Sequence, residues 1–85
     1  MPYIVYMIKT TNSSYKKTYV GFTNNLFLRL KKHNNNKGAK STKGYKWELI
    51  FKKEFSNKND ALSYEYKLKK DRKKRTSILN TFNEK

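Results

Sequence analysis

Near its start the chain carries the apolar stretch Tyr3-Ile4-Val5-Tyr6-Met7-Ile8. Its β-branched and aromatic side chains favour a buried β-strand. A turn cluster at 10–14 follows, and the run Lys17-Thr18-Tyr19-Val20-Gly21 is typical of a second strand. The two runs predict an antiparallel hairpin, in which the phenols of Tyr6 and Tyr19 would approach one another. The alternative is ordinary packing of both rings, with their hydroxyls at the surface.

The rest of the chain predicts three helices and one more strand. The helices are expected at 26–33, at about 57–71 and at 72–82, and the strand at 47–55. Thr23 or Asn24 is the expected N-cap of the first helix, and Ser56 or Asn57 that of the second. The resulting order β-β-α-β-α-α indicates an α/β fold of the α+β class, with a small central antiparallel three-stranded sheet flanked by helices.

The composition limits what such a fold can be. At 85 residues, of which 35% are hydrophobic and 15% aromatic, the chain has room for a single domain, 1–85. It lacks cysteine and has one histidine, which excludes Cys-based zinc sites and His-only metal clusters. No apolar stretch is long enough to span a bilayer and no leader precedes the first strand, so we expect a cytoplasmic protein.

The formal net charge of +15 is the strongest global signal. A positive field of this size attracts polyanions, and counterion release then drives binding. Nucleic acid is therefore the expected partner, whereas a membrane is disfavoured because no long basic amphipathic helix is present.

Lysines and hydroxyls in the loop at 37–46 suit a phosphate backbone. They are Lys37, Lys40, Lys43 and Lys46, with Ser41, Thr42 and Tyr45 among them. A merely solvated loop is the alternative.

One acid, Glu65, is predicted to lie on the inward face of its helix. Residues three and four apart share a helical face, which places Glu65 in line with Ala61, Leu62 and Leu68. The chain has only six acids against 21 Lys and Arg, so an inward acid requires a reason. Pairing with a buried cation and holding a metal ion are the two explanations, and the spacing does not choose between them.

The first helix presents a mixed face at the same spacing. Leu26, Arg29, Leu30 and His33 share it, so Arg29 and His33 are neighbours beside the buried leucines. The alternative is an amphipathic helix whose edge residues extend out to water.

Two tyrosines, an arginine, a histidine and an inward glutamate in a basic domain form a coherent set for phosphodiester hydrolysis. These candidates are Tyr6, Tyr19, Arg29, His33 and Glu65. A metal on Glu65 would polarise the phosphate, and Arg29 would neutralise the charge that builds on it. A phenol near Arg29 or the metal would have its pKa lowered toward neutrality and would deprotonate a water molecule.

The same residues resemble the GIY-YIG nuclease domain. Its two short tyrosine motifs are similar to Ile4-Val5-Tyr6 and Tyr19-Val20-Gly21, and its arginine–histidine helix is similar to 22–34. Its alanine–glutamate–leucine–lysine helix is similar to 61–70. The resemblance covers residues 3–79 and is specific, because order, spacing and predicted structure agree.

The resemblance implies a metal-dependent endonuclease that hydrolyses DNA. It implies one divalent ion at Glu65, magnesium with manganese as a substitute, and it places Arg29 on the scissile phosphate. It also implies Tyr6 or Tyr19 as the general base, of which we favour Tyr6, with His33 supporting the tyrosine or transferring a proton. The degenerate first motif and the lysine-rich loop look most like the branched-DNA, structure-specific subgroup and its small stand-alone bacterial or viral relatives. Branched or flapped DNA is therefore the expected substrate.

Three positions depart from the family pattern. Ile4 replaces the glycine that opens the first motif, and Phe22 stands where some relatives carry lysine. Asn80 is a candidate for the family's late asparagine, but its long distance from Glu65 along the sequence leaves it unassigned. These departures keep open a second interpretation, a catalytically inactive nucleic-acid-binding module of the same fold. The sequence leaves undecided whether DNA or RNA is cut, whether a protein partner or a second copy takes part, and whether the role is repair, recombination or another process.

Overall fold

Three strands and three α-helices make up the computed structural model, which describes residues 2–11, 17–37 and 40–83. In chain order they are β1 (Tyr3–Thr10), β2 (Thr18–Thr23), α1 (Leu26–Asn34), β3 (Trp47–Phe55), α2 (Lys58–Lys70) and α3 (Arg72–Asn83). The predicted order and the α+β class are confirmed. A short 3₁₀ helix, η1 (Lys40–Thr42), has no counterpart among the predicted elements. Residues 12–14 of the expected turn lie outside the described residues.

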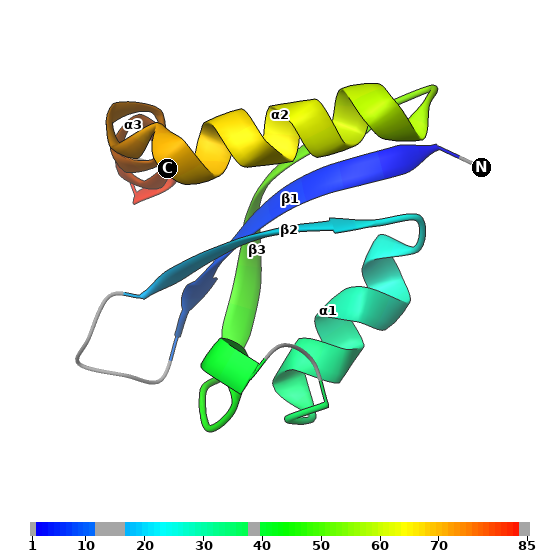
Figure 1. Ribbon diagram of the computed structural model, residues 1–85. Helices are drawn as coiled ribbons and strands as arrows, with labels where there is room; N and C mark the ends of the chain where they lie inside the picture. Colours follow the sequence, from blue (N-terminus) through cyan, green and yellow to red (C-terminus); the bar gives the residue numbers. More distant parts are fainter. Residues whose placement is uncertain (1, 12–16, 38–39, 84–85) are drawn as a thin grey trace.

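The sheet has the strand order β2-β1-β3, with both pairs antiparallel. The predicted hairpin is present, and it pairs Tyr6 with Gly21. A register shift between Met7 and Ile8 marks a bulge in the pairing with β3. Helices α2 and α3 cover one face of the sheet, and α1 covers the other (Figure 1). Side chains of α1 and α2 can therefore contribute to one site only at an edge or an end of the sheet.

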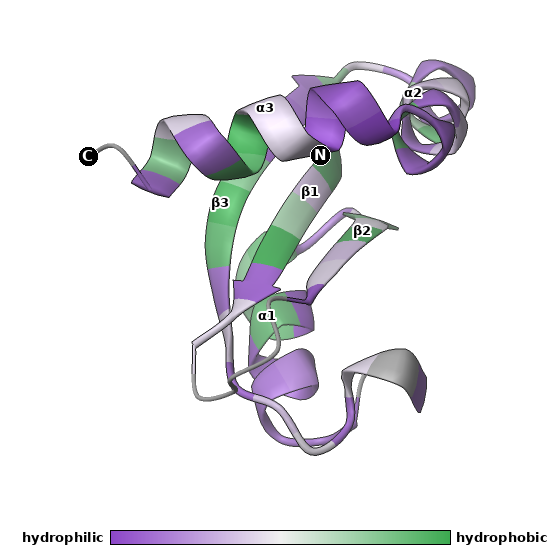
Figure 2. Ribbon diagram, turned by 90° about the vertical axis from the view of Figure 1, so that its left-hand side faces the viewer, coloured by the Kyte–Doolittle hydropathy of each residue, from purple (hydrophilic) through white to green (hydrophobic). Residues whose placement is uncertain are grey.

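Strand β1 is buried on both faces, because helices cover both sides of the sheet. Its successive side chains point alternately to the two sides. On one face Val5 and Met7 pack against Ala61 and Leu68 of α2. On the other face a cluster on the α1 side contains Ile4, Tyr6, Ile8 and Trp47, with Tyr19, Leu26 and Leu30 packed around them. Figure 2 shows hydrophobic stretches within β1 and β3 beside largely hydrophilic helices. In the part of the chain that the structure describes, no helix is long and apolar enough to cross a membrane.

Asparagine side chains begin α1 and α2. The Asn25 Oδ1 accepts the backbone N–H of Leu28 at 3.2 Å, so the predicted cap of α1 at Thr23 or Asn24 is wrong. The reason is local: the Thr23 hydroxyl accepts the backbone N–H of Asn25 at 3.0 Å and makes a turn before the helix. Asn57, one of the two predicted alternatives, caps α2.

Gly21 lets β2 approach the ring of Tyr6 more closely than a residue with a side chain could. A Cβ atom on Gly21 would lie 2.3 Å from the Tyr6 Oη and 2.4 Å from its Cζ, far inside van der Waals contact. It would also lie 2.9 Å from the Tyr19 Cε2. The Tyr6 ring is fully buried, and side chains in a close-packed interior can move aside only by displacing their neighbours. The glycine of the second motif therefore makes room for the Tyr6 hydroxyl.

We predict that Gly21→Ala destabilises the protein by about 1–3 kcal/mol, the usual range for overpacking. In a Tyr6→Leu background, which lacks the ring, the same change should cost less by at least about 0.5 kcal/mol, as for other residues in contact. Chemical denaturation of the four proteins in this cycle measures both quantities. Gly44→Ala is the control: its Cβ would meet nothing within 4 Å, so its cost should not depend on Tyr6. Equal costs of Gly21→Ala in the two backgrounds would contradict the close contact.

Candidate active site

The hydroxyl of Tyr6 is the centre of a buried hydrogen-bond chain. The Arg29 Nε–H donates to it at 3.3 Å and uses one acceptor site of the phenol oxygen. The proton of the hydroxyl is then directed to the His33 Nε2, at 2.7 Å. In a neutral imidazole the proton is consequently on Nδ1, which lies 3.0 Å from the Thr42 Oγ1. The chain runs from Arg29 through Tyr6 and His33 to Thr42.

Helix α1 supplies both Arg29 and His33, which lie one turn apart on its inward face, as predicted. His33 is fully buried and Arg29 is half-buried. Two hydrogen bonds tie the end of α1 to the start of β3. The Trp47 N–H donates to the Asn34 Oδ1 at 2.6 Å, and the Asn34 Nδ2 donates to the Trp47 carbonyl at 3.2 Å. They hold the last turn of α1, and with it His33, against the sheet.

Thr42 belongs to this hydrogen-bond chain, although the sequence did not indicate that role. Its side chain is fully buried, and its carbonyl oxygen accepts the indole N–H of Trp47 at 2.9 Å. The sequence placed Thr42 among hydroxyls facing a phosphate backbone, which is wrong because its hydroxyl is buried against His33. A hydroxyl residue between lysines carries no signal that separates these two roles.

Tyr19 joins the cluster from β2. Its ring centroid lies 5.0 Å from that of His33 and 6.4 Å from that of Tyr6. Tyr6 is fully buried, whereas Tyr19 is only half-buried. The hydrogen bond to Tyr6 raises the pKa of Arg29, burial opposes it, and Tyr19 adds a smaller upward contribution. The predicted approach of the two tyrosines is confirmed, with Tyr6 inside and Tyr19 nearer the surface.

Burial decides the protonation state of the pair Tyr6 and His33. It raises the pKa of Tyr6 to about 12, although the hydrogen bond and the charge of Arg29 act in the opposite direction. The expectation that Arg29 brings the pKa of this phenol toward neutrality is therefore wrong, because loss of solvent outweighs one cation. Burial first, and then the charge of Arg29, lowers the pKa of His33. At neutral pH a protonated phenol thus donates to a neutral imidazole.

Glu65 approaches from α2, on the other face of the sheet (Figure 1). Its side chain is 17% exposed, and it shares the inward stripe with the buried residues Ala61 and Leu68, as expected. Leu62, expected on the same stripe, is 38% exposed instead. Tyr64 packs against the core instead. The inward face of α2 is therefore formed by positions 61, 64, 65 and 68, and position 62 lies outside it.

The carboxylate of Glu65 pairs with Lys69, one turn further along α2, at 3.5 Å. The sequence offered a buried cation as the partner of this acid, but the partner is a lysine side chain that is 52% exposed. Such pairs along a helix contribute only about 0.3–0.5 kcal/mol. A cavity of about 190 Å³ beside β2 is lined by Lys69 and by Tyr19. The charge of Glu65 is also among the factors that raise the pKa of Tyr6. Glu65 therefore lies within electrostatic reach of Tyr6.

A lone carboxylate in this position suits magnesium better than a closed metal cage. Among the residues that the structure describes, no three His, Cys, Asp or Glu side chains are grouped so that they could hold an ion. Magnesium keeps several of its waters and is usually held by one or two carboxylates together with substrate phosphates. Glu65, whose ion pair with Lys69 is weak, fits the role of such a single protein ligand.

The basic loop has a buried and an exposed side. Thr42 is on the buried side, and four lysines are on the exposed side. These are Lys37, Lys40, Lys43 and Lys46. The Lys46 Nζ also donates to the Asn34 carbonyl at 3.2 Å. Nucleic-acid contact by these lysines stays a prediction. Asn80, to which the sequence assigned no role, is exposed on α3.

A three-stranded sheet with two tyrosines against an arginine and a histidine of the next helix defines a small basic domain of the nuclease type. The family model described as the GIY-YIG catalytic domain matches residues 2–82. The chain therefore belongs to the GIY-YIG family, as its motifs predicted. Membership implies a nuclease with a nucleic-acid substrate, and nucleases of this family generally depend on a divalent metal ion.

The chain is similar to small stand-alone GIY-YIG proteins. The UPF0213 protein YazA of Bacillus subtilis is 42% identical over 74 residues, which are 86% of this chain and 72% of that protein. Protein L300 of Acanthamoeba polyphaga mimivirus is 42% identical over 78 residues, 86% of this chain but 46% of that protein. The solution NMR structure of the UPF0213 protein BH0048 from Bacillus halodurans has a TM-score of 0.53 at 29% identity and covers 95% of this chain and 85% of that one.

We predict that the pKa of His33 lies below 6.5 and that its Nδ1 carries the proton in the neutral form. Because the unfolded state then takes up the proton first, the free energy of unfolding should fall as the pH is lowered from about 6.5 through the folded-state pKa. Nitrogen-15 NMR of the one imidazole measures pKa and tautomer, and denaturation at several pH values measures the stability. Thr42→Val should disturb the tautomer, whereas the exposed control Thr76→Val should not. A proton on Nε2 in the wild type would contradict the direction of the Tyr6–His33 hydrogen bond.

Proposed function

We propose that this protein is a metal-dependent endonuclease that hydrolyses DNA phosphodiester bonds and prefers branched or flapped DNA. The observation that carries the proposal is the hydrogen-bond chain Arg29–Tyr6–His33, which lies within electrostatic reach of the half-buried Glu65. A guanidinium, a phenol with a proton acceptor behind it and a carboxylate are the groups that phosphodiester hydrolysis requires. Family membership supports nuclease chemistry, and the choice of DNA structure goes beyond it.

Arg29 is proposed to bind the scissile phosphate. Its Nε donates to Tyr6 at 3.3 Å, and the side chain also lines an open groove at the surface. The guanidinium offers five N–H donors, so its terminal nitrogens can hold a phosphate oxygen while Nε keeps its contact with the phenol. Charge that builds on the phosphate during attack would be neutralised there. This placement also brings the phosphate next to the Tyr6 hydroxyl.

Tyr6 is proposed as the general base, with His33 as the final acceptor of its proton. A phenol with a pKa of about 12 does not ionise at neutral pH by itself. The neutral His33 Nε2 at 2.7 Å can take the phenol proton as the phenol oxygen takes one from the attacking water. No free phenolate forms in this exchange, and the imidazolium that results keeps its Nδ1–H on Thr42. The lowered pKa of His33 keeps the acceptor neutral until that moment.

Glu65 is proposed to hold the divalent ion, which is magnesium or, as a substitute, manganese. When bound, this ion would supply a Lewis acid for the phosphate and would stabilise the leaving oxygen. Glu65 must release Lys69 to serve as a ligand, and the exposed position of that lysine makes the exchange inexpensive in free energy.

The charge of the protein fits a DNA substrate around this site. The exposed lysines of the loop lie beyond the end of α1, and the net charge of +15 favours any polyanion. Lys37, Lys40, Lys43 and Lys46 are the proposed contacts to the phosphate backbone. Such contacts are not specific for sequence, so branch preference must come from the shape of the site and its surroundings.

We predict that Glu65→Gln lowers the rate of magnesium-dependent DNA cleavage at least about 100-fold, because the variant loses the charge that holds the ion. DNA affinity should stay within about threefold, since DNA binding rests mainly on the lysines. Glu54→Gln, which removes the same charge from an exposed position of β3, is the matched control and should cut like the wild type.

Cleavage of a flapped duplex, and affinity measured by fluorescence anisotropy, test these statements. Equal cleavage by wild type and Glu65→Gln would show that the activity does not belong to this site. If the wild type binds DNA with a steep salt dependence but yields no product with magnesium, the inactive binding module, the second interpretation of the sequence, is correct.

A further inference from the structure

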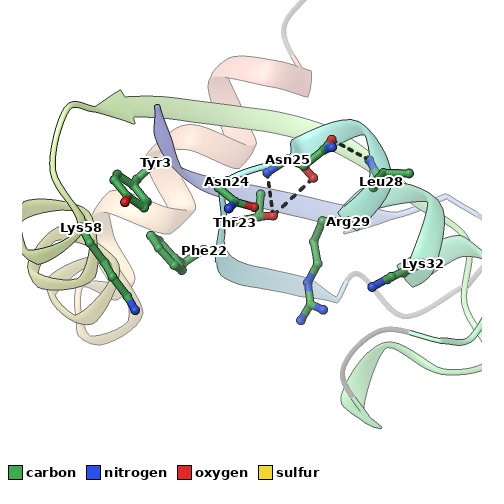
Figure 3. Close-up of a pocket in the computed structure, with 9 residues that line it drawn as sticks. All are labelled: Tyr3, Phe22, Thr23, Asn24, Asn25, Leu28, Arg29, Lys32 and Lys58. Atoms are coloured by element: carbon green, nitrogen blue, oxygen red, sulfur yellow. Dashed lines mark hydrogen bonds between the residues drawn. The ribbon is translucent and has the colours of Figure 1, made fainter. Parts of the chain in front are cut away.

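A groove of about 560 Å³ opens beside Arg29, between the first turns of α1 and the start of α2. Figure 3 shows Tyr3, Phe22 and Lys58 on one side of it and Arg29 and Lys32 on the other. Volumes of roughly 300–1,000 Å³ are typical of sites for small organic ligands. The groove is continuous with the proposed active site, because Arg29 belongs to both.

One wall of the groove is a rigid aromatic surface. The rings of Tyr3 and Phe22 are stacked at an interplanar angle of 10°, with their centroids 5.9 Å apart. Both rings pack on the hydrophobic core and are half-buried, and both also line the groove. Flat aromatic surfaces of this kind are the usual platforms on which unpaired nucleic-acid bases stack, whatever their sequence.

The charges around this aromatic wall suit the phosphates on either side of such a base. Arg29 and Lys32 lie on the opposite wall and Lys58 lies beside the rings (Figure 3). Of the described residues that line the groove, none is acidic. Lysines from two helices, Lys32 of α1 and Lys58 of α2, thus supply positive charge around the aromatic rings.

We propose that this groove is a subsite for one unpaired nucleotide of the DNA strand that is cut. Its base stacks on the Phe22 ring, which Tyr3 supports by stacking on it, the phosphate on one side of the base is the scissile phosphate on Arg29, and Lys58 neutralises the strand on the other side. In intact duplex DNA both faces of a base are covered by its neighbours, so only a strand with an unpaired nucleotide at this place can fill the subsite. The proposal rests on the proposed function and gives a physical reason for a preference for flapped or branched DNA.

The experiment uses a 5′-flapped duplex with 2-aminopurine at the first unpaired nucleotide, and the same duplex without the flap, in buffer without divalent metal. Binding of the wild type should quench the fluorescence of 2-aminopurine, because the base becomes stacked on an aromatic ring. Phe22→Leu, which keeps an apolar side chain toward the core, should abolish the quenching and weaken binding of the flapped DNA by about 5- to 150-fold. Affinity for the plain duplex should change by less than about twofold.

Phe27→Leu is the matched control: it replaces an α1 phenylalanine that is 79% exposed and does not line the groove. It should leave quenching and both affinities unchanged. Absence of quenching with the wild type would overturn the proposal without any variant, and so would equal losses of affinity for both DNAs in a folded Phe22→Leu protein. Cleavage with magnesium is measured separately. Quenching without cleavage would support the subsite and contradict the proposed nuclease activity. Cleavage without quenching would support the nuclease activity and contradict the subsite.

Discussion

The structure depends on the placement of one hydroxyl group, that of the buried Tyr6. Room for it exists because Gly21 has no side chain, so that β2 can lie against the phenol. Two residues of α1 then satisfy the hydroxyl, Arg29 as donor and His33 as acceptor. Because a buried polar group without partners would be costly, the orientation of α1 on the sheet and the position of the hydroxyl determine each other. The fold and the candidate site are thus one structural problem.

This arrangement makes the site electrostatically asymmetric. Burial holds the proton on Tyr6 and removes it from His33, so donor and acceptor are already assigned at neutral pH. In the proposed mechanism the pair acts as a relay and needs no ionised tyrosine. Glu65 enters from the opposite face of the sheet, near β2, where its charge still acts on Tyr6. The groove beside Arg29 continues from the candidate active site toward the start of α2.

Local patterns in the sequence predicted most of the fold. Strand and helix periods gave the element order, and the spacing of Arg29 and His33 placed both on the buried face of α1. Interactions that form only on folding were not predictable. The N-cap of α1 is Asn25 and not the predicted Thr23 or Asn24, because the Thr23 hydroxyl accepts the backbone N–H of Asn25. Thr42 became a partner of His33 through the path of a loop, and the raised pKa of Tyr6 results from burial that no spacing reveals.

The central claim is that Arg29 and Tyr6 on one side and Glu65 on the other act on the same phosphate. A crystal structure of the protein with Mn²⁺ and a flapped DNA that has a non-hydrolysable scissile linkage tests it directly. The account predicts an anomalous manganese peak on the Glu65 carboxylate, Lys69 displaced from it, and a phosphate between the ion and the Arg29 guanidinium, beside the Tyr6 hydroxyl. Manganese bound elsewhere, or DNA bound with the Glu65–Lys69 pair intact and no phosphate at Arg29, would contradict it.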